Sequence, residues 1–219
     1  MAVIRKKIMG PPGTGKTHRL VHHYLNEEIN NLHTDPQRIA YVTFTKAAAS
    51  DGEKKVQDVF PGVKLLYIST LHAMGTRELG ISKKQVLTDT KWIQFKNVYP
   101  IYSDINFDSY INDHGVTISQ DRNLQVINYS RAKLISLERA CIDLKYHEGA
   151  VDIFRVKQLE RDIEYYKGQT NMYEFSDMIK LFVDEEKHLA LDAIFLDEAQ
   201  DLNPSQWRMF FYIEALCKR

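Results

Sequence analysis

A glycine-rich stretch near the start of the chain has the residue types and spacing of a phosphate-binding loop. Residues 8–20 read IMGPPGTGKTHRL, and Gly10 to Thr17 fit the pattern G-x-x-x-x-G-K-[ST]. Such glycines let backbone N–H groups point at an anion, and the helix that follows adds its positive N-terminal end. In this pattern Lys16 reaches the outer phosphates and the Thr17 hydroxyl binds Mg²⁺. The alternative is a turn that binds nothing; a location between a predicted strand and a predicted helix favours the nucleotide site.

A pair of acids near the other end of the chain offers a second chemical group. In the stretch IFLDEAQD an apolar strand leads to Asp197, whose carboxylate would reach the sheet edge beside the Mg²⁺ held by Thr17. Glu198 follows and is placed to take a proton from an attacking water. A small-molecule kinase has no use for this second acid, so the pair favours a hydrolase. The alternative is an exposed acidic helix cap.

Composition limits the class of protein but does not name a partner. The 219 residues allow one or two domains, and the net charge is zero. Residues 1–80 hold 11 Lys and Arg against 7 Asp and Glu (+4), whereas residues 169–219 hold 5 against 10 (−5). This asymmetry indicates an anion site at one end and a carboxylate cluster at the other. Two cysteines without metal spacing, and no signal peptide or long apolar run, lead us to expect a soluble cytoplasmic protein without a membrane partner.

Apolar patterns predict strands that alternate with helices at both ends of the chain. Helices are predicted after the glycine loop, over 46–60, and from Asn203-Pro204 through Leu216. Strands are predicted at Ile8–Met9 and over 38–44, 63–70 and 192–201. This alternation predicts an α/β fold with a parallel sheet covered on both faces.

The middle of the chain has helical patterns and almost no strand. Helices are predicted over 89–99, 123–147 and 151–167, and residues 170–182 return the chain to the sheet. We therefore expect a sheet domain made of residues 1–81 and 169–219, interrupted by an all-helical insertion over residues 82–168.

Five stretches resemble, in the expected order, the motifs of UvrD/Rep-like superfamily 1 DNA helicases. They are GPPGTGKT (10–17), YVTFTKAAAS (41–50), STLHAMG (69–75), YEFSDMI (173–179) and DEAQD (197–201). They cover the sheet domain, and the family places a helical insertion where this chain has one. The resemblance implies a RecA-like P-loop NTPase sheet with an all-helical inserted subdomain, which uses ATP and Mg²⁺.

The resemblance also implies a role for individual residues. ATP would be bound by the loop and the start of its helix: Gly10, Pro11, Pro12, Gly13, Thr14, Gly15, Lys16, Thr17, His18 and Arg19. Thr17 and Asp197 would hold the metal, while Lys16, Glu198 and Gln200 would be catalytic. Single-stranded DNA would be contacted by Thr43, Phe44, Thr45 and His72. An aromatic ring at a strand end can stack on a base for about 1–3 kcal/mol; the alternative for Phe44 is a core position.

Three departures from the family pattern bear on this expectation. Only the short run Met1–Ile8 precedes Met9, where the family has an adenine-reading glutamine segment, and His18 stands where arginine is common. Both bear on recognition of the base. Gly52 replaces an apolar helix residue, which we expect to loosen that helix by about 1 kcal/mol relative to alanine.

The extent of the resemblance predicts half of a motor. Nothing before the last residue, Arg219, resembles the family's later motifs. We expect the N-terminal half of a bacterial or phage-encoded helicase, whose partners are single-stranded DNA or a duplex junction and the C-terminal RecA-like domain of the same protein. Travel would be 3′→5′, and residues 1–219 alone would bind ATP·Mg²⁺ but hydrolyse it barely. The alternatives are an AAA-type ATPase and a non-hydrolysing nucleic-acid-binding module.

Overall fold

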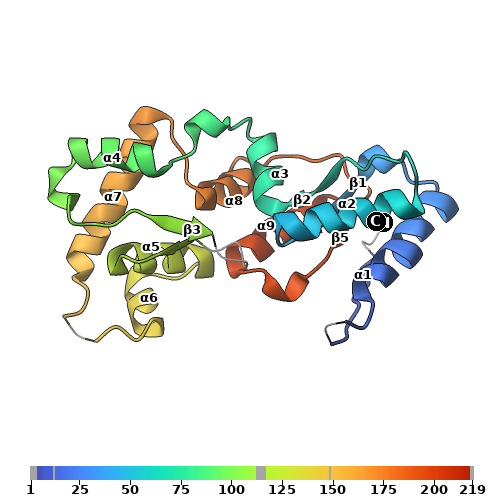
Figure 1. The fold of residues 1–219 in the computed structure, drawn as a ribbon, viewed down its shortest axis with the longest axis horizontal. Helices are drawn as coiled ribbons and strands as arrows, with labels where there is room; N and C mark the ends of the chain where they lie inside the picture. Colours follow the sequence, from blue (N-terminus) through green and yellow to red (C-terminus); the bar gives the residue numbers. More distant parts are fainter. Residues whose placement is uncertain (1–3, 12, 112–116, 148, 218–219) are drawn as a thin grey trace.

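The computed structural model describes residues 4–11, 13–111, 117–147 and 149–217. The molecule is elongated, with a parallel sheet and its helices at one end and a mainly helical part at the other (Figure 1). This arrangement confirms the predicted α/β class. Within the described ranges, no helix combines the length and apolar character needed to cross a membrane.

The sheet has three parallel strands in the order β2-β1-β5. They are β1 (Ile39–Thr43), β2 (Tyr67–Thr70) and β5 (Ala193–Leu196), and Val42 lies opposite Ser69 on one side and Leu196 on the other. All five residues of the central strand are buried. Each strand lies inside a range predicted from the sequence but is shorter than that range.

The strand predicted at Ile8–Met9 does not form. Residues 4–11 have no regular secondary structure, and Met9 is 79% exposed. Two charged side chains tie this segment to the surface, because Arg5 pairs with Glu214 at 2.7 Å and Lys6 with Glu27 at 2.8 Å. Consecutive cations do not suit a buried strand, and here they find acidic partners outside the sheet.

Helices cover both faces of the sheet. The loop helix α1 (Lys16–Arg19) continues into wider π-type turns over Leu20–Leu25 and Glu27–Asn31. It packs with α2 (Lys46–Val59) against one face, where Ile39 and Tyr41 point. Helices α3 (Leu71–Glu78), α8 (Phe175–Asp184) and α9 (Pro204–Leu216) pack against the other face, where Ala40 and Val42 point. Because successive side chains of β1 point to opposite faces of the sheet, they contribute to two separate apolar cores.

Gly52 of α2 has a packing role that its low helix propensity hides. A Cβ atom at this position would lie 2.6 Å from Cε1 of the Tyr41 ring and 3.3 Å from its Cδ1 and Cζ. The missing side chain makes room for a large ring beneath the helix. The expected loss from poor helix propensity is therefore accompanied by a gain from the fully buried Tyr41.

The inserted part has its own apolar core. Its helices are α4 (Asp89–Val98), α5 (Arg122–Lys133), α6 (Leu137–Asp143) and α7 (Ile153–Thr170), and its core includes Phe95, Tyr102 and Tyr166. Tyr165, beside Tyr166, is 63% exposed. Because this core is separate from the two sheet cores, we propose the division into residues 1–81 with 169–219 and residues 82–168.

Two predictions for the insertion are corrected. It is not all-helical, because β3 (Ser109–Ile111) and β4 (Thr117–Ser119) form an antiparallel pair. The single helix predicted over 123–147 is broken between α5 and α6 at Leu134, whose φ of 57° is left-handed. The Ser130 hydroxyl donates to the carbonyl of Ile135 at 2.6 Å and holds this break.

Candidate functional site

The glycine loop is open, and its lysine is held by the loop itself. Gly13 and Gly15 have φ values of 79° and 76°, which suit glycine, and no atom lies within 4 Å of the Cβ position of either. Lys16 donates from Nζ to the carbonyls of Gly10 and Pro11, each at 3.0 Å. Pro12 lies outside the described residues. The glycines thus adopt the left-handed conformation that the loop requires, and the Lys16 ammonium lies against two of the loop carbonyls.

The loop helix and the end of β5 meet through Thr17 and Asp197. The Thr17 hydroxyl donates to Oδ2 of Asp197 at 2.8 Å, across a separation of 180 residues. The backbone N–H of Asp197 donates to the carbonyl of Val42 at 2.9 Å, so the carboxylate starts from the last rung of the sheet. Asp197 is 8% exposed. The two sequence motifs thus converge at one sheet edge, as parallel strands require.

A tyrosine that the sequence did not single out completes the surroundings of Asp197. The Tyr41 hydroxyl donates to the same Oδ2 at 2.8 Å, and the N–H of Glu198 donates to Oδ1 at 3.0 Å. Burial raises the pKa of Tyr41, and the neighbouring Asp197 charge raises it further. The phenol therefore stays protonated and remains a hydrogen-bond donor. Its place in an apolar strand gave no signal of this contact.

Glu198 and Gln200 lie beside Asp197 in a strained turn. Glu198 has a left-handed backbone, with φ 55° and ψ 39°, which is uncommon for a residue other than glycine. Its Oε2 accepts a hydrogen bond from Nε2 of Gln200 at 2.5 Å. Glu198 is half-buried and Gln200 is exposed. The turn therefore places a second carboxylate next to Asp197, held by the Gln200 amide.

The oxygen atoms of Thr17 and Asp197 fit a magnesium ion. Mg²⁺ prefers oxygen ligands at about 2.0–2.1 Å in octahedral geometry, which places neighbouring ligands about 2.9 Å apart. The observed separation of the two oxygens is 2.8 Å. The direct hydrogen bond between the two groups has nearly the same length as a ligand–ligand contact around the ion.

The residues predicted near the adenine base are exposed. His18 stacks on His22, with ring centroids 3.8 Å apart, and the Arg19 guanidinium lies 5.9 Å from the centre of the Tyr24 ring. Both side chains therefore lie on the outer surface of the loop helix. Their contacts are with neighbouring turns of the same helical segment.

Two of the four residues predicted to contact DNA are buried. Thr43 is 1% exposed and donates to the carbonyl of Thr45 at 3.0 Å, while Phe44 is 5% exposed and belongs to a sheet core. Both side chains lie within the packing around the sheet, and their contact with a single strand stays a prediction. Thr45 is half-buried and caps α2 by accepting from the N–H of Ala48.

His72 lies in a cavity between the sheet part and the insertion. This cavity has a volume of about 430 Å³, and its lining includes Arg131 of α5, Phe175 of α8 and Arg208 of α9. The His72 ring meets the edge of Phe175 at 6.3 Å. Burial lowers the pKa of His72 to about 4, so the imidazole is neutral near pH 7.

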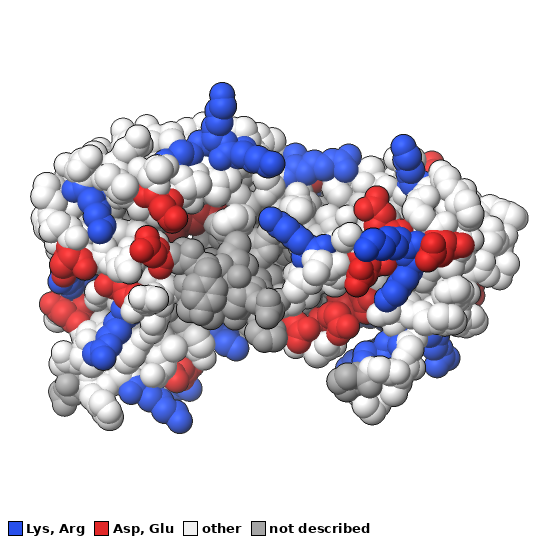
Figure 2. Space-filling model, in the orientation of Figure 1, with Lys and Arg blue, Asp and Glu red and all other residues white. Residues whose placement is uncertain are grey.

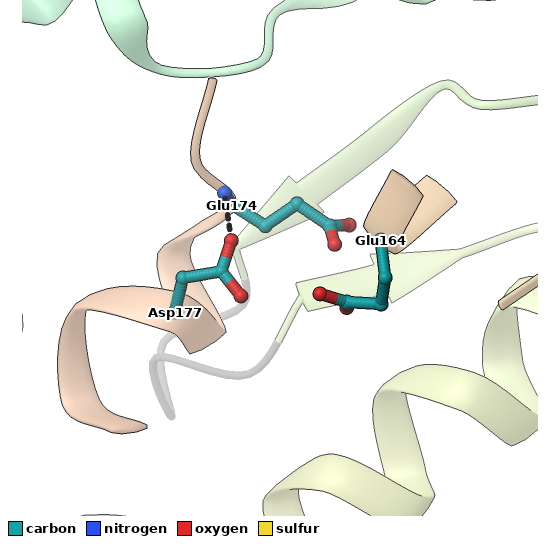
Figure 3. A group of neighbouring side chains, drawn as sticks. All are labelled: Glu164, Glu174 and Asp177. Atoms are coloured by element: carbon teal, nitrogen blue, oxygen red, sulfur yellow. Dashed lines mark hydrogen bonds between the residues drawn. The ribbon is translucent and has the colours of Figure 1, made fainter. Parts of the chain in front are cut away.

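A cluster of acids next to this cavity already has its cation. Figure 3 shows the carboxylates of Glu164, Glu174 and Asp177, which lie close enough to one another to hold a metal ion. Nζ of Lys167 donates to all three, at 2.8, 3.0 and 2.8 Å, and Arg131 donates to Glu174 at 2.6 Å. Burial alone would raise the pKa of Glu174, but these two cations bring it to about 2. The cluster is an ion network, not an open metal site.

The surface charge is mixed. Figure 2 shows Lys and Arg side chains along the upper edge of the viewed face, with Asp and Glu side chains interspersed below them. The described part of this face carries both signs of charge, in keeping with the net charge of zero. Electrostatic attraction alone therefore does not identify a nucleic-acid path on it.

Comparison with known proteins agrees with the family resemblance. A family model described as the UvrD/REP helicase N-terminal domain matches residues 5–216. A curated relative, the "ATP-dependent DNA helicase PcrA" of Leuconostoc citreum, is 24% identical over 226 residues. That similarity covers 91% of this chain and 28% of the relative. The chain thus spans little more than a quarter of the length of that relative.

Proposed function

The chain belongs to the UvrD/REP helicase N-terminal domain family, and on this basis we propose that it is the ATP-binding part of an ATP-dependent DNA helicase. The observation that carries the proposal is the 2.8 Å contact between Thr17 and Asp197, which joins the phosphate loop to the acidic motif. The family match over residues 5–216 favours this proposal over an AAA-type ATPase.

Nucleotide binding would begin with an exchange of partners at Lys16. Its ammonium now donates to the carbonyls of Gly10 and Pro11, and phosphate oxygens would be stronger, charged acceptors for the same group. The loop N–H groups of Gly13 to Thr17 and the start of the helix would meet the remaining phosphate charge. His18 and Arg19 are exposed beside this position and would face the nucleoside.

Thr17 and Asp197 would hold Mg²⁺ through their oxygen atoms. Bound there, the ion would neutralise charge on the outer phosphates of ATP. Thr17 would then turn its hydroxyl proton away from Asp197, since its oxygen lone pair is needed for the ion. The hydrogen bond seen between the two residues is replaced in this step.

Glu198 would act as general base for hydrolysis. A water molecule attacks the γ-phosphorus, its proton passes to a carboxylate oxygen of Glu198, and ADP leaves with the β–γ bridging oxygen. The amide of Gln200 already donates to Glu198 and would orient both this carboxylate and the attacking water. These two residues, with Lys16, form the proposed catalytic group.

We propose single-stranded DNA, or its junction with a duplex, as the partner that ATP hydrolysis moves. Thr45 and His72 remain the candidates for DNA contact, since they follow β1 and β2 at the sheet edge and are half-buried. A second RecA-like domain of the same protein would close the other side of the ATP site, and travel would be 3′→5′.

The proposal is tested by nucleotide binding. Fluorescent ATP analogue should bind residues 1–219 more tightly with Mg²⁺ than with EDTA, and Lys16→Ala should lose most of this affinity. Lys55→Ala is the matched control, because it removes an exposed lysine of α2 that is not part of the glycine loop. Binding that is absent in the wild-type protein, or unchanged by Lys16→Ala, would overturn the proposal.

A further inference from the structure

The carboxylate of Asp197 is held by two hydroxyl groups that differ in their freedom to move. Thr17 and Tyr41 both donate to Oδ2 at 2.8 Å. We propose that Tyr41 is a positioning residue that fixes the orientation of Asp197 for cation binding. This inference rests on the proposed function of Asp197 as a magnesium ligand.

The two donors would behave differently when a cation binds. The Thr17 oxygen is itself a proposed ligand, so its proton must leave Asp197 as the ion arrives. The Tyr41 oxygen is bound to a rigid ring on the central strand, which is fully buried and flanked in register by Ile68 and Phe195. Tyr41 would therefore keep its hydrogen bond to Asp197 in both states.

A retained donor of this kind affects metal affinity although it does not touch the ion. Groups that hydrogen-bond to a ligating carboxylate limit its rotation, and their loss typically reduces metal affinity or activity about 10- to 100-fold. The N–H of Glu198 holds Oδ1 from the other side at 3.0 Å. Without Tyr41, Oδ2 would have Thr17 as its partner only until the cation takes the threonine oxygen.

Gly52 fixes where the Tyr41 hydroxyl can lie. An added Cβ at position 52 would come within 2.6 Å of Cε1, on the edge of the ring next to the hydroxyl-bearing carbon. The ring shares a buried core with Val21 and Leu25, which lie outside α2, so a movement of the ring away from α2 would disturb this packing. A side chain at position 52 would therefore shift the hydroxyl from Asp197.

The first test removes the hydroxyl and keeps the ring. Mg²⁺ is titrated into wild-type and Tyr41→Phe proteins with fluorescent ADP as the reporter of binding. Tyr41→Phe should need about 10-fold more Mg²⁺ for half-maximal binding, while ADP affinity in EDTA stays unchanged. Tyr67→Phe is the matched control, because it removes a buried tyrosine hydroxyl that donates to Glu78 from the neighbouring strand. The control should titrate like the wild-type protein.

The second test uses Gly52→Ala in both backgrounds. Alone, this substitution should raise the Mg²⁺ requirement, because it displaces the hydroxyl. Added to Tyr41→Phe, it should raise the requirement no further, although thermal unfolding should show a similar loss of stability in both backgrounds. Equal increases of the Mg²⁺ requirement in the two backgrounds would contradict the link between Gly52 and the Tyr41 hydroxyl.

The outcomes separate this inference from the proposed function. If Mg²⁺ does not improve ADP binding to the wild-type protein, the proposed function itself fails. If Mg²⁺ does improve it and Tyr41→Phe titrates like the wild-type and Tyr67→Phe proteins, only the role of Tyr41 is overturned. A Tyr41→Phe protein that is less stable but has an unchanged Mg²⁺ midpoint would make Tyr41 a packing residue.

Discussion

Lys167 donates to both carboxylate oxygens of Asp177, at 2.8 and 2.9 Å, and so ties the last helix of the insertion to α8. Lys167 is 5% exposed. Its loss would leave the carboxylates of Glu164, Glu174 and Asp177 without their central cation. Lys167→Ala should therefore lower the free energy of unfolding by about 3–5 kcal/mol, as measured by urea denaturation.

Two comparisons sharpen this first prediction. Lys180→Ala on α8, whose side chain is 68% exposed, should cost less than about 1 kcal/mol. Added Ca²⁺ should restore part of the stability of Lys167→Ala, because three carboxylates then offer an oxygen site, and should change the wild-type protein little. Equal stability of the two lysine variants would show that the network contributes no net stability.

The stability of the protein should fall between pH 6.5 and about 4 because of His72. Burial lowers the pKa of this imidazole from 6.5 to about 4, so the unfolded chain binds a proton in this window while the folded protein does not. The stability that the neutral His72 contributes is fully present above pH 6.5 and is lost as the pH falls. The pKa difference corresponds to about 3 kcal/mol. We expect the free energy of unfolding to fall by about 2 kcal/mol, since water in the cavity screens the charge.

The histidine prediction is checked by urea unfolding across that pH range. In His72→Gln the free energy of unfolding should fall less as the pH is lowered, because the glutamine side chain does not titrate. The difference should equal the loss assigned to His72. His188→Gln removes an exposed histidine and should leave the slope as it is. An unchanged slope in His72→Gln would assign the pH dependence to other groups, including the acids around Lys167.

Replacement of Phe44 should reduce the stability of the protein, whatever its effect on DNA binding. Because its ring is 5% exposed in the sheet core, Phe44→Ala should cost about 3–5 kcal/mol of unfolding free energy. Phe211→Ala, at 52% exposure on α9, should cost less than about 1 kcal/mol. Denaturation curves decide this. A small loss for Phe44→Ala would mean that the ring leaves the core easily and is free to stack on a base.

Residues 1–219 should bind ATP·Mg²⁺ and hydrolyse it only slightly. In related phosphate-loop enzymes, an arginine that reaches the γ-phosphate raises the rate of hydrolysis about 10³–10⁵-fold. Of the two arginines nearest the loop in sequence, Arg5 is paired with Glu214, and Arg19 lies on the outer surface of the loop helix, over the ring of Tyr24. A general base contributes about 10²–10⁴ only when its water is held in line. Phosphate release should therefore be near background with and without single-stranded DNA.

Glu198→Gln provides the control for this activity prediction. It should change the small residual rate little in residues 1–219 and abolish turnover in a protein that includes the second domain. Strong DNA-stimulated hydrolysis by residues 1–219 would overturn the prediction and point to an arginine from a second copy of the chain. A non-hydrolysing module would show no effect of Glu198→Gln in either protein.

Sequence patterns predicted the parts of the fold that are set by local periodicity and by motifs. Helix α9 begins at Pro204 and ends at Leu216 as predicted, because Asn203 caps it and proline occupies its first turn. The position of Asp197 beside Thr17 also follows from the motifs, since both come at the same edge of a parallel sheet.

Other features depend on contacts that no local pattern reveals. Tyr41 and its partner Asp197 are 156 residues apart, and in sequence Tyr41 is simply one more member of an apolar strand. The end of β1 looked open for Phe44, but α3, α8 and α9 cover that face of the sheet. The β3–β4 pair has strands of three residues, too short for an alternating pattern to stand out.

The order of strands in the sheet has a consequence for synthesis of the protein on the ribosome. Strand β1 ends at Thr43, but its partner β5 begins only at Ala193, so 150 residues must be made before that edge is paired. At about 5–20 residues per second, the newborn chain carries β1 with this edge unpaired for about 8–30 s. Chaperones that recognise extended apolar segments could bind this open strand edge, and translational pausing within the insertion would prolong its exposure.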